Sequence, residues 1–181
     1  QWRSSWLSRE GVASVATLSF SLLAIGAETP AGNKPGGPVR LKFNVQQLRL
    51  DNNEGCAIAD YNRDGKLDIS ACEFWYAGPD FKTRHTFYDP VPQVLEKNPT
   101  NSMFTFPYDF NGDGRIDLLV LGRVLFHEAF WYENPGAGEA TKPDARWKKH
   151  FVSRRVCGES PLFEDINGDG RPEIISISGE T

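Results

Sequence analysis

Short apolar runs of four or five residues, separated by polar segments rich in Gly and Asp, recur from about residue 39 to the end of the chain. Runs of this length, bounded by Gly or Asp, are typical of buried β-strands. Beyond residue 38 no segment shows the 3.6-residue apolar period of an amphipathic helix. The pattern predicts an all-β domain over residues 39–181, with strands that include 56–59, 74–76, 118–121, 130–132, 147–152 and 174–177.

A nine-residue motif, Asp-x-Asn-x-Asp-Gly-x-x-Asp/Glu, occurs three times between these predicted strands. Its copies occupy residues 60–68, 109–117 and 165–173, so their first residues are 49 and 56 positions apart. A period of about 40 to 50 residues is typical of the four-stranded blades of a β-propeller, and the longer second interval indicates an insertion. The tripeptide Phe-Trp-Tyr recurs at 74–76 and 130–132, which we expect to be equivalent positions of successive blades. The repeat predicts about three blades of four antiparallel strands, a partial propeller.

The motif carries the residue types of a calcium-binding loop. Positions 1, 3, 5 and 9 supply side-chain oxygens, position 7 offers a backbone carbonyl, and Gly at position 6 allows a sharp turn. This number of hard oxygen ligands suits Ca²⁺ better than Mg²⁺, which prefers a tighter octahedron that includes water. We predict about three Ca²⁺ sites, with Lys66, Arg115 and Arg171 contributing carbonyls only. Their ligands are Asp60, Asn62, Asp64, Lys66 and Asp68; Asp109, Asn111, Asp113, Arg115 and Asp117; and Asp165, Asn167, Asp169, Arg171 and Glu173.

An EF-hand and a polar hairpin turn are the two other interpretations of the loops. An EF-hand uses the same opening residues but needs a Glu at position 12 and a following helix. Position 12 is Ala71, Val120 and Ser176 in the three copies, and β-rich runs follow, so the EF-hand is excluded. Polar hairpin turns without metal are the other alternative. Three further carboxylates at fixed spacing favour the metal site over such turns.

Charge separates the loops from the rest of the chain. The net charge is −4 and the loops hold nine carboxylates, so the remainder sums to about +5. Without a cation the loops would repel themselves, which predicts calcium-dependent stability. The basic residues are scattered, with the densest at 148–149 and 154–155, so a nucleic-acid partner is not expected.

The N-terminal segment resembles a secretory signal. Arg3 and Arg9 precede an uncharged stretch, 11–27, with an apolar centre at 20–25. This stretch falls short of the roughly 18 strongly apolar residues of a membrane span, which favours a cleaved signal. An uncleaved membrane anchor is the alternative. We assign residues 1–27 to a signal peptide and 28–38, rich in Pro, Gly and Ala, to a linker, and expect an extracytoplasmic protein. Because the chain begins with Gln1 and stops just after a strand-like run, we expect it to be the N-terminal part of a larger propeller.

Three cysteines allow at most one disulfide within the chain. Cys56 and Cys72 lie symmetrically about Asp64, so a hairpin that closes around this loop would place them opposite each other. Two reduced cysteines that pack as small apolar residues are the alternative.

The loops, their period and the flanking strands resemble the FG-GAP/VCBS repeat family, over about residues 39–181. This family includes the integrin α-chain propeller and many secreted bacterial proteins, and the side-chain ligand positions above match its loop motif. The departures are Glu173 in place of Asp and the absence of the Phe-Gly and Gly-Ala-Pro segments of the family. The resemblance implies blades of a propeller of about seven. The second departure puts integrin-like ligand recognition in doubt.

Two functions follow from this resemblance. The first is a secreted, non-catalytic adhesion or recognition module with structural Ca²⁺, whose partner is a carbohydrate that stacks on the Phe-Trp-Tyr aromatics or an extracellular protein. The second is the propeller domain of a carbohydrate lyase or dehydratase. No GxSxG, HExxH, P-loop or CxxC motif occurs, and no catalytic residue is assigned. The side chains available to an enzyme are His85, His127, His150, Tyr76, Tyr132 and Arg84.

Overall fold

The structure, a computed structural model, describes residues 41–51, 54–90, 102–122 and 127–177, together with the backbone of 20–23 and 26–27. Regular structure in these residues is almost entirely β, with one short helix. The predicted all-β class is confirmed.

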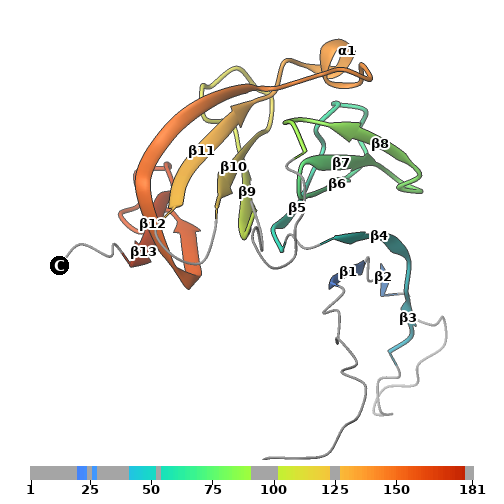
Figure 1. Cartoon of the computed structure of the whole chain (residues 1–181), viewed down its shortest axis with the longest axis horizontal. Coiled ribbons are helices and arrows are strands. Elements are labelled where there is room, and N and C mark those ends of the chain that lie inside the picture. The colour runs from blue at the N-terminus through green and yellow to red at the C-terminus, as the bar shows by residue number, and fades with distance from the viewer. Residues whose placement is uncertain are drawn as a thin grey trace, which may run out of the picture.

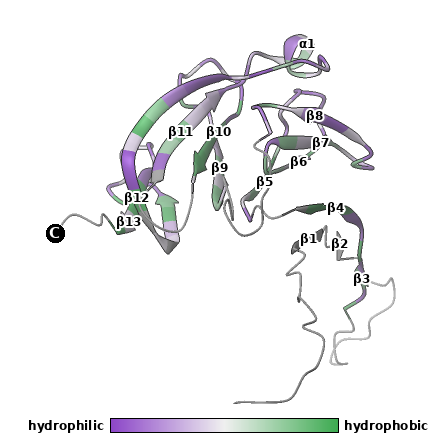
Figure 2. Ribbon diagram, in the orientation of Figure 1, coloured by the Kyte–Doolittle hydropathy of each residue, from purple (hydrophilic) through white to green (hydrophobic). Residues whose placement is uncertain are grey.

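The first blade is an antiparallel sheet of four strands in chain order (Figure 1). It contains β5 (Cys56–Ala59), β6 (Asp68–Ala71), β7 (Phe74–Ala77) and β8 (Thr83–Thr86). Because β6 lies inside the sheet with both faces covered, all four of its residues are buried. The outer strand β8 is exposed or half-buried and is mostly purple in Figure 2.

The second blade repeats this arrangement with β9 (Phe104–Tyr108), β10 (Asp117–Leu121), β11 (His127–Glu133) and the first half of β12 (Lys148–Glu164). The five residues of β10 are all buried, and the strand is green in Figure 2. The curved strand β12 spans 17 residues; its second half pairs with β13 (Glu173–Ile177) as the start of a third blade (Figure 1). Two four-stranded blades and two strands of a third confirm the predicted blade architecture in the described residues.

The Phe-Trp-Tyr tripeptides occupy equivalent positions, as predicted. In β7, Trp75 pairs with His85 of β8, and in β11, Trp131 pairs with His150 of β12. Phe74 follows Asp60 by 14 positions, whereas Phe130 follows Asp109 by 21. The insertion in the second interval therefore lies between β10 and the Phe-Trp-Tyr segment of β11. The helix α1 (Ala137–Ala140) lies after that segment, between β11 and β12.

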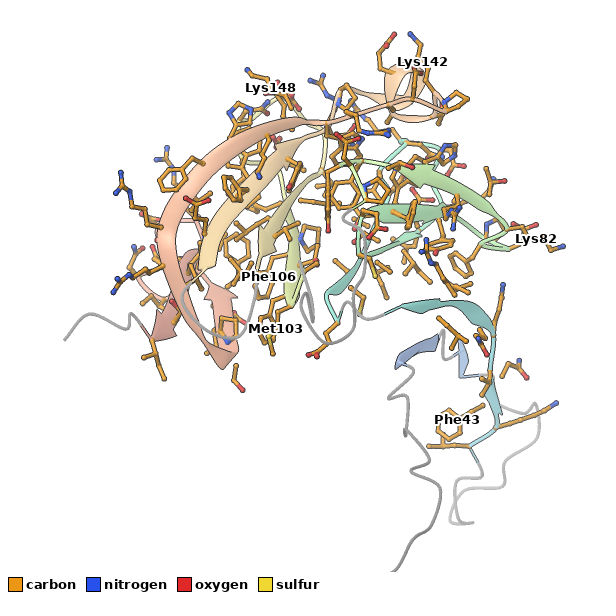
Figure 3. All side chains as sticks on the ribbon, viewed as in Figure 1. Phe43, Lys82, Met103, Phe106, Lys142 and Lys148 are labelled. Atoms are coloured by element: carbon orange, nitrogen blue, oxygen red, sulfur yellow. The ribbon has the colours of Figure 1, made fainter. Side chains whose placement is uncertain are left out.

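The core lies between blades. Between the first and second blades, buried side chains come from both sheets: Ala57, Tyr61, Trp75, Phe87, Leu118, Val120, Tyr132, Ala140 and Trp147. A second cluster joins Leu119, Leu121, Ala129 and Val156 of the second blade with Phe163 and Ile174 of the third. Phe106, labelled in Figure 3, packs against this second cluster. Each blade is thus stabilised mainly by its neighbour.

An N-terminal arm precedes the blades. The strand β1 (Phe20–Leu23) pairs with β4 (Gln47–Asp51), and β2 (Gly26–Ala27) pairs with β3 (Phe43–Asn44). Most of the predicted signal and linker lies outside the described residues. Figure 3 shows the labelled Phe43 on this arm, away from the blades. Leu48 of the arm packs on the first blade's other face, beside Phe74 and Tyr76. None of the helices in the described part of the chain is long and apolar enough to cross a membrane.

The expected opposition of Cys56 and Cys72 is wrong by one residue. The register pairs Cys56 with Ala71 and Ala59 with Asp68. Neighbouring residues of a strand point to opposite faces, so this shift separates the two thiols. Cys56 is exposed, Cys72 is buried, and no disulfide joins them.

Candidate functional site

All three predicted loops occupy the same place in their blades. Each joins the innermost strand to the second one: β5 to β6, β9 to β10, and β12 to β13. The hydroxyl of Tyr108 in β9 donates to the carbonyl of Gly170 in the third loop at 3.3 Å, so loops also contact the neighbouring blade. The repeated sequence therefore forms a repeated structural position.

The three loop backbones share one conformation. The position-6 glycines, Gly65, Gly114 and Gly170, have φ angles of 82°, 81° and 85°. These left-handed values are strained for residues with a Cβ, which explains the invariance of Gly among the copies. Position 4 is also left-handed, with φ angles of 75° and 78° at Gly112 and Gly168 and 60° at Arg63.

The first five positions fold inward through hydrogen bonds to the loop backbone. The carboxylate of Asp60 accepts from the N–H of Asp64 at 3.1 Å and from that of Gly65 at 2.9 Å. The side-chain oxygen of Asn62 accepts from Asp64 N–H at 3.0 Å, and the Asp64 carboxylate accepts from Lys66 N–H at 2.9 Å. The other two loops repeat this pattern bond for bond, from Asp109, Asn111 and Asp113 and from Asp165, Asn167 and Asp169.

Position 9 ties the loop to another strand in the first two blades. The fully buried Asp68 accepts from Tyr61 N–H at 2.9 Å and from Gly78 N–H, beyond β7, at 2.9 Å. The equally buried Asp117 accepts from Phe110 N–H at 3.0 Å and from Asn134 N–H, beyond β11, at 2.8 Å. These carboxylates therefore hold the loop and the end of the third strand together.

The third loop differs at position 9. Glu173 accepts from Ile166 N–H at 3.0 Å and from the side-chain amide of Asn167 at 2.7 Å. Both partners belong to its own loop. Glu173 thus closes the loop on itself within the described residues.

Burial raises the pKa of the position-9 carboxylates Asp68 and Asp117. It raises the pKa of Asp117 to about 6 against the lowering effect of the two backbone N–H donors, and the nearby charges of Asp113 and Asp109 raise it further. Burial also raises the pKa of Asp68, with added repulsion from Asp60 and Asp64. A cation in either loop would favour the ionised form, because opposite charges lower a carboxyl pKa.

Basic side chains at position 7 contact position 5, a role that the sequence analysis missed. Lys66 lies 3.6 Å from the Asp64 carboxylate, and Arg115 forms an ion pair with Asp113. The pKa of Asp113 is lowered: slight burial opposes the shift, and hydrogen bonds from Arg115 N–H and the Asn111 amide outweigh it. The sequence has a basic residue two positions after each position-5 Asp, and this spacing could have predicted the contact.

The loops supply the donor types that Ca²⁺ takes, namely three carboxylates and one amide oxygen each. The residues therefore fit the ion by their chemistry. Among the described residues, no three His, Cys, Asp or Glu side chains converge as a group that could hold a metal. Carboxylate oxygens of the loops accept backbone N–H bonds in this arrangement. The Ca²⁺ sites and their ligand sets stay a prediction.

The histidines are part of repeated aromatic stacks. His85 stacks on Trp75 with ring centroids 4.2 Å apart, and His150 stacks on Trp131 at 4.0 Å. His150 also lies 2.7 Å from the Glu133 carboxylate. The side chain of the remaining candidate, His127, lies outside the described residues.

The remaining residues considered for sugar binding or catalysis are engaged in packing. Phe74, Trp75 and Tyr76 are buried, at 6%, 0% and 5% exposure. Tyr132 is buried between the first two blades. Arg84 places its guanidinium 4.2 Å from the centre of the Phe74 ring. Trp75 and Tyr132 thus belong to the core between blades, whereas Phe74, Tyr76 and Arg84 pack on the other face of the first blade.

Blades of four antiparallel strands in chain order, each with a loop between its first and second strands, define a protein of the β-propeller class. Residues 109–176 match the family model described as an FG-GAP-like repeat. This match confirms the resemblance over the second and third loops and the strands between them. Comparison with curated proteins and with solved structures gives no match.

Proposed function

We propose that this protein is an extracytoplasmic β-propeller module that binds Ca²⁺ in its blade loops and acts in adhesion or recognition rather than catalysis. The observation that carries the proposal is the threefold recurrence of one loop: the same left-handed positions, the same inward hydrogen bonds and the same oxygen donors. Hairpin turns need no such set of carboxylates.

The bound ion would supply positive charge among three carboxylates in each loop. The side chains that would hold it are those of positions 1, 3, 5 and 9, with the carbonyl of position 7. Asp68 and Asp117 also join the loop to the end of the third strand. Stabilising their ionised form therefore stabilises the blade, which gives the ion a structural role.

The test is unfolding of the full chain with and without Ca²⁺. Extracellular sites have dissociation constants of roughly 10⁻⁴ to 10⁻³ M, so millimolar Ca²⁺ adds on the order of 0.4 to 1.4 kcal/mol per loop. We expect the Tm to fall when a chelator is added and to recover with Ca²⁺ but not with Mg²⁺. A triple variant, Asp60→Asn, Asp109→Asn and Asp165→Asn, is expected to lose this response. A wild-type Tm that a chelator does not change would contradict the proposal.

Burial of the Phe-Trp-Tyr aromatics argues against a sugar partner. Phe74, Trp75, Tyr76 and Tyr132 are buried, which leaves little ring surface for a stacked sugar, so the proposal takes an extracellular protein as the partner. A soluble glycan array checks this choice. A glycan hit that the free sugar competes away would redirect the proposal to carbohydrate recognition.

A further inference from the structure

Asn134 lies just beyond β11 and has no solvent-exposed surface. Its amide nitrogen donates to the carbonyl of Tyr61 in the first blade at 2.8 Å and to that of Ile116 in the second at 3.0 Å. Its side-chain oxygen accepts from Gly136 N–H at 2.9 Å. Both amide protons and the carbonyl oxygen are therefore engaged, and the side chain spans two blades.

Both carbonyls that Asn134 contacts belong to the repeated loops. Tyr61 is position 2 of the first loop, between the predicted ligands Asp60 and Asn62. Ile116 is position 8 of the second loop, and the backbone N–H of Asn134 donates to position 9, Asp117. One buried side chain thus joins the ligand-bearing backbones of neighbouring loops.

The two ends of this bridge are held firmly. The N–H of Tyr61 donates to Asp68, and its buried ring lies against Trp75 and Trp147, with centroids 6.2 and 6.1 Å away. At the other end, Nε of Arg115 donates to the backbone carbonyl of Asn134 at 2.8 Å. Because both ends are fixed, a shift of either loop changes the hydrogen bonds that the Asn134 side chain makes.

The equivalent residue of the first blade cannot form such a bridge. Gly78 occupies that place and donates its N–H to Asp68, as Asn134 does to Asp117. A Cβ on Gly78 would lie 2.1 Å from the carbonyl oxygen of Leu67. Of the two four-stranded blades that the structure describes, the second therefore has the bridge and the first does not.

We propose that Asn134 is a positioning residue that couples the first and second loops, so that cation binding in one loop strengthens cation binding in the other. This inference rests on the proposed calcium binding. A buried amide proton that loses its acceptor is costly, so the arrangement of one loop favours the matching arrangement of the other. Coupling of two binding equilibria is reciprocal, so either loop reports it.

The test is a Ca²⁺ titration of the full chain by NMR. The amide resonances of Gly65 and Gly114 report the first and second loops separately, because each amide donates to the position-1 carboxylate of its own loop. Asp113→Asn disables the second loop. We expect it to weaken Ca²⁺ binding at Gly65 by about fivefold or more, while Asp169→Asn in the third loop leaves the Gly65 curve unchanged.

A second set of variants assigns the coupling to Asn134. In an Asn134→Ala background, adding Asp113→Asn is expected to leave the Ca²⁺ titration curve of the Gly65 amide unchanged. Val120→Ala is the matched control, because Val120 is buried in the same interface and forms no part of the bridge. It lowers stability, but the dependence of the Gly65 curve on Asp113→Asn remains.

Each outcome decides between the two proposals. If Gly65 titrates identically in the wild type and in Asp113→Asn, the coupling is wrong and calcium binding stands. Coupling that persists in Asn134→Ala would refute the role of Asn134. If neither glycine responds to Ca²⁺ in the wild type, the proposed function fails and the coupling with it. The wild-type comparison leaves Asn134 in place, so it is decisive even where the alanine variant does not fold.

Discussion

The second and third loops have nearly the same sequence and the same backbone, yet their surroundings differ. In the second loop, Phe110 packs against Trp131 of its own blade and Phe163 of the third blade, and Asp117 is fully buried. In the third loop, Ile166 occupies the place of Phe110 and is 66% exposed. Within the described residues no further blade covers it. The motif therefore sets the conformation of the loop, and the following blade sets its burial.

The largest expected difference is at position 2. Tyr61→Ala removes a fully buried ring between the first two blades and should cost about 3 to 5 kcal/mol of unfolding free energy. Ile166→Ala removes an exposed side chain and should change it by less than about 0.5 kcal/mol. Urea unfolding of the two variants measures both. Equal losses would show that burial at this position does not depend on the next blade.

Position 9 gives a smaller contrast. Asp117→Ala leaves the part-buried N–H of Phe110 and the buried N–H of Asn134 without an acceptor, whereas Glu173→Ala frees groups at the surface. Both variants lose the same kind of predicted Ca²⁺ ligand, so the difference between them reports burial. In millimolar Ca²⁺, Asp117→Ala should lose about 1 to 3 kcal/mol more unfolding free energy than Glu173→Ala. The reverse order would contradict the role of Asp117 in holding the loop and the end of the third strand together.

The smallest expected effect is a pH dependence of stability, measured in the presence of a chelator. Burial raises the pKa of Asp117 from 3.8 to about 6 in the folded state. The folded state therefore binds this proton more tightly than the unfolded state, so the contribution of Asp117 to stability is greatest below about pH 4 and is lost as pH rises to about 6. Asp117→Asn cannot titrate there and should lack this part of the fall. Parallel pH profiles of Tm for the two proteins would contradict the shift.

Ca²⁺ sharpens the same measurement. A cation beside Asp117 favours its ionised form and lowers its pKa. The fall in Tm between pH 4 and 6 should therefore shrink when Ca²⁺ replaces the chelator. A fall of unchanged size in Ca²⁺ would argue against binding in the second loop.

Much of the fold was predictable from the sequence because the repeat is strong. The three loops, the strands beside them and the equivalence of residues 74–76 with 130–132 all follow from spacing and from short apolar runs. The pairing of Cys56 with Cys72 did not follow, because symmetry about one residue leaves the register uncertain by one position and the register decides the face. The Trp–His stacks were also missed, since the two partners of each stack lie on different strands.

The sequence by itself determined the local chemistry: the left-handed glycines, the oxygen donors and the β-strands that frame them depend on residues within a few positions of one another. The tertiary structure alone decided which of these groups are buried and what they join. Asp117 and Glu173 have similar neighbours in sequence, but in the part of the chain that the structure describes Asp117 is fully buried and accepts from Asn134 N–H, whereas Glu173 bonds within its own loop. Burial and inter-blade hydrogen bonds depend on contacts between distant segments, and no local pattern encodes them.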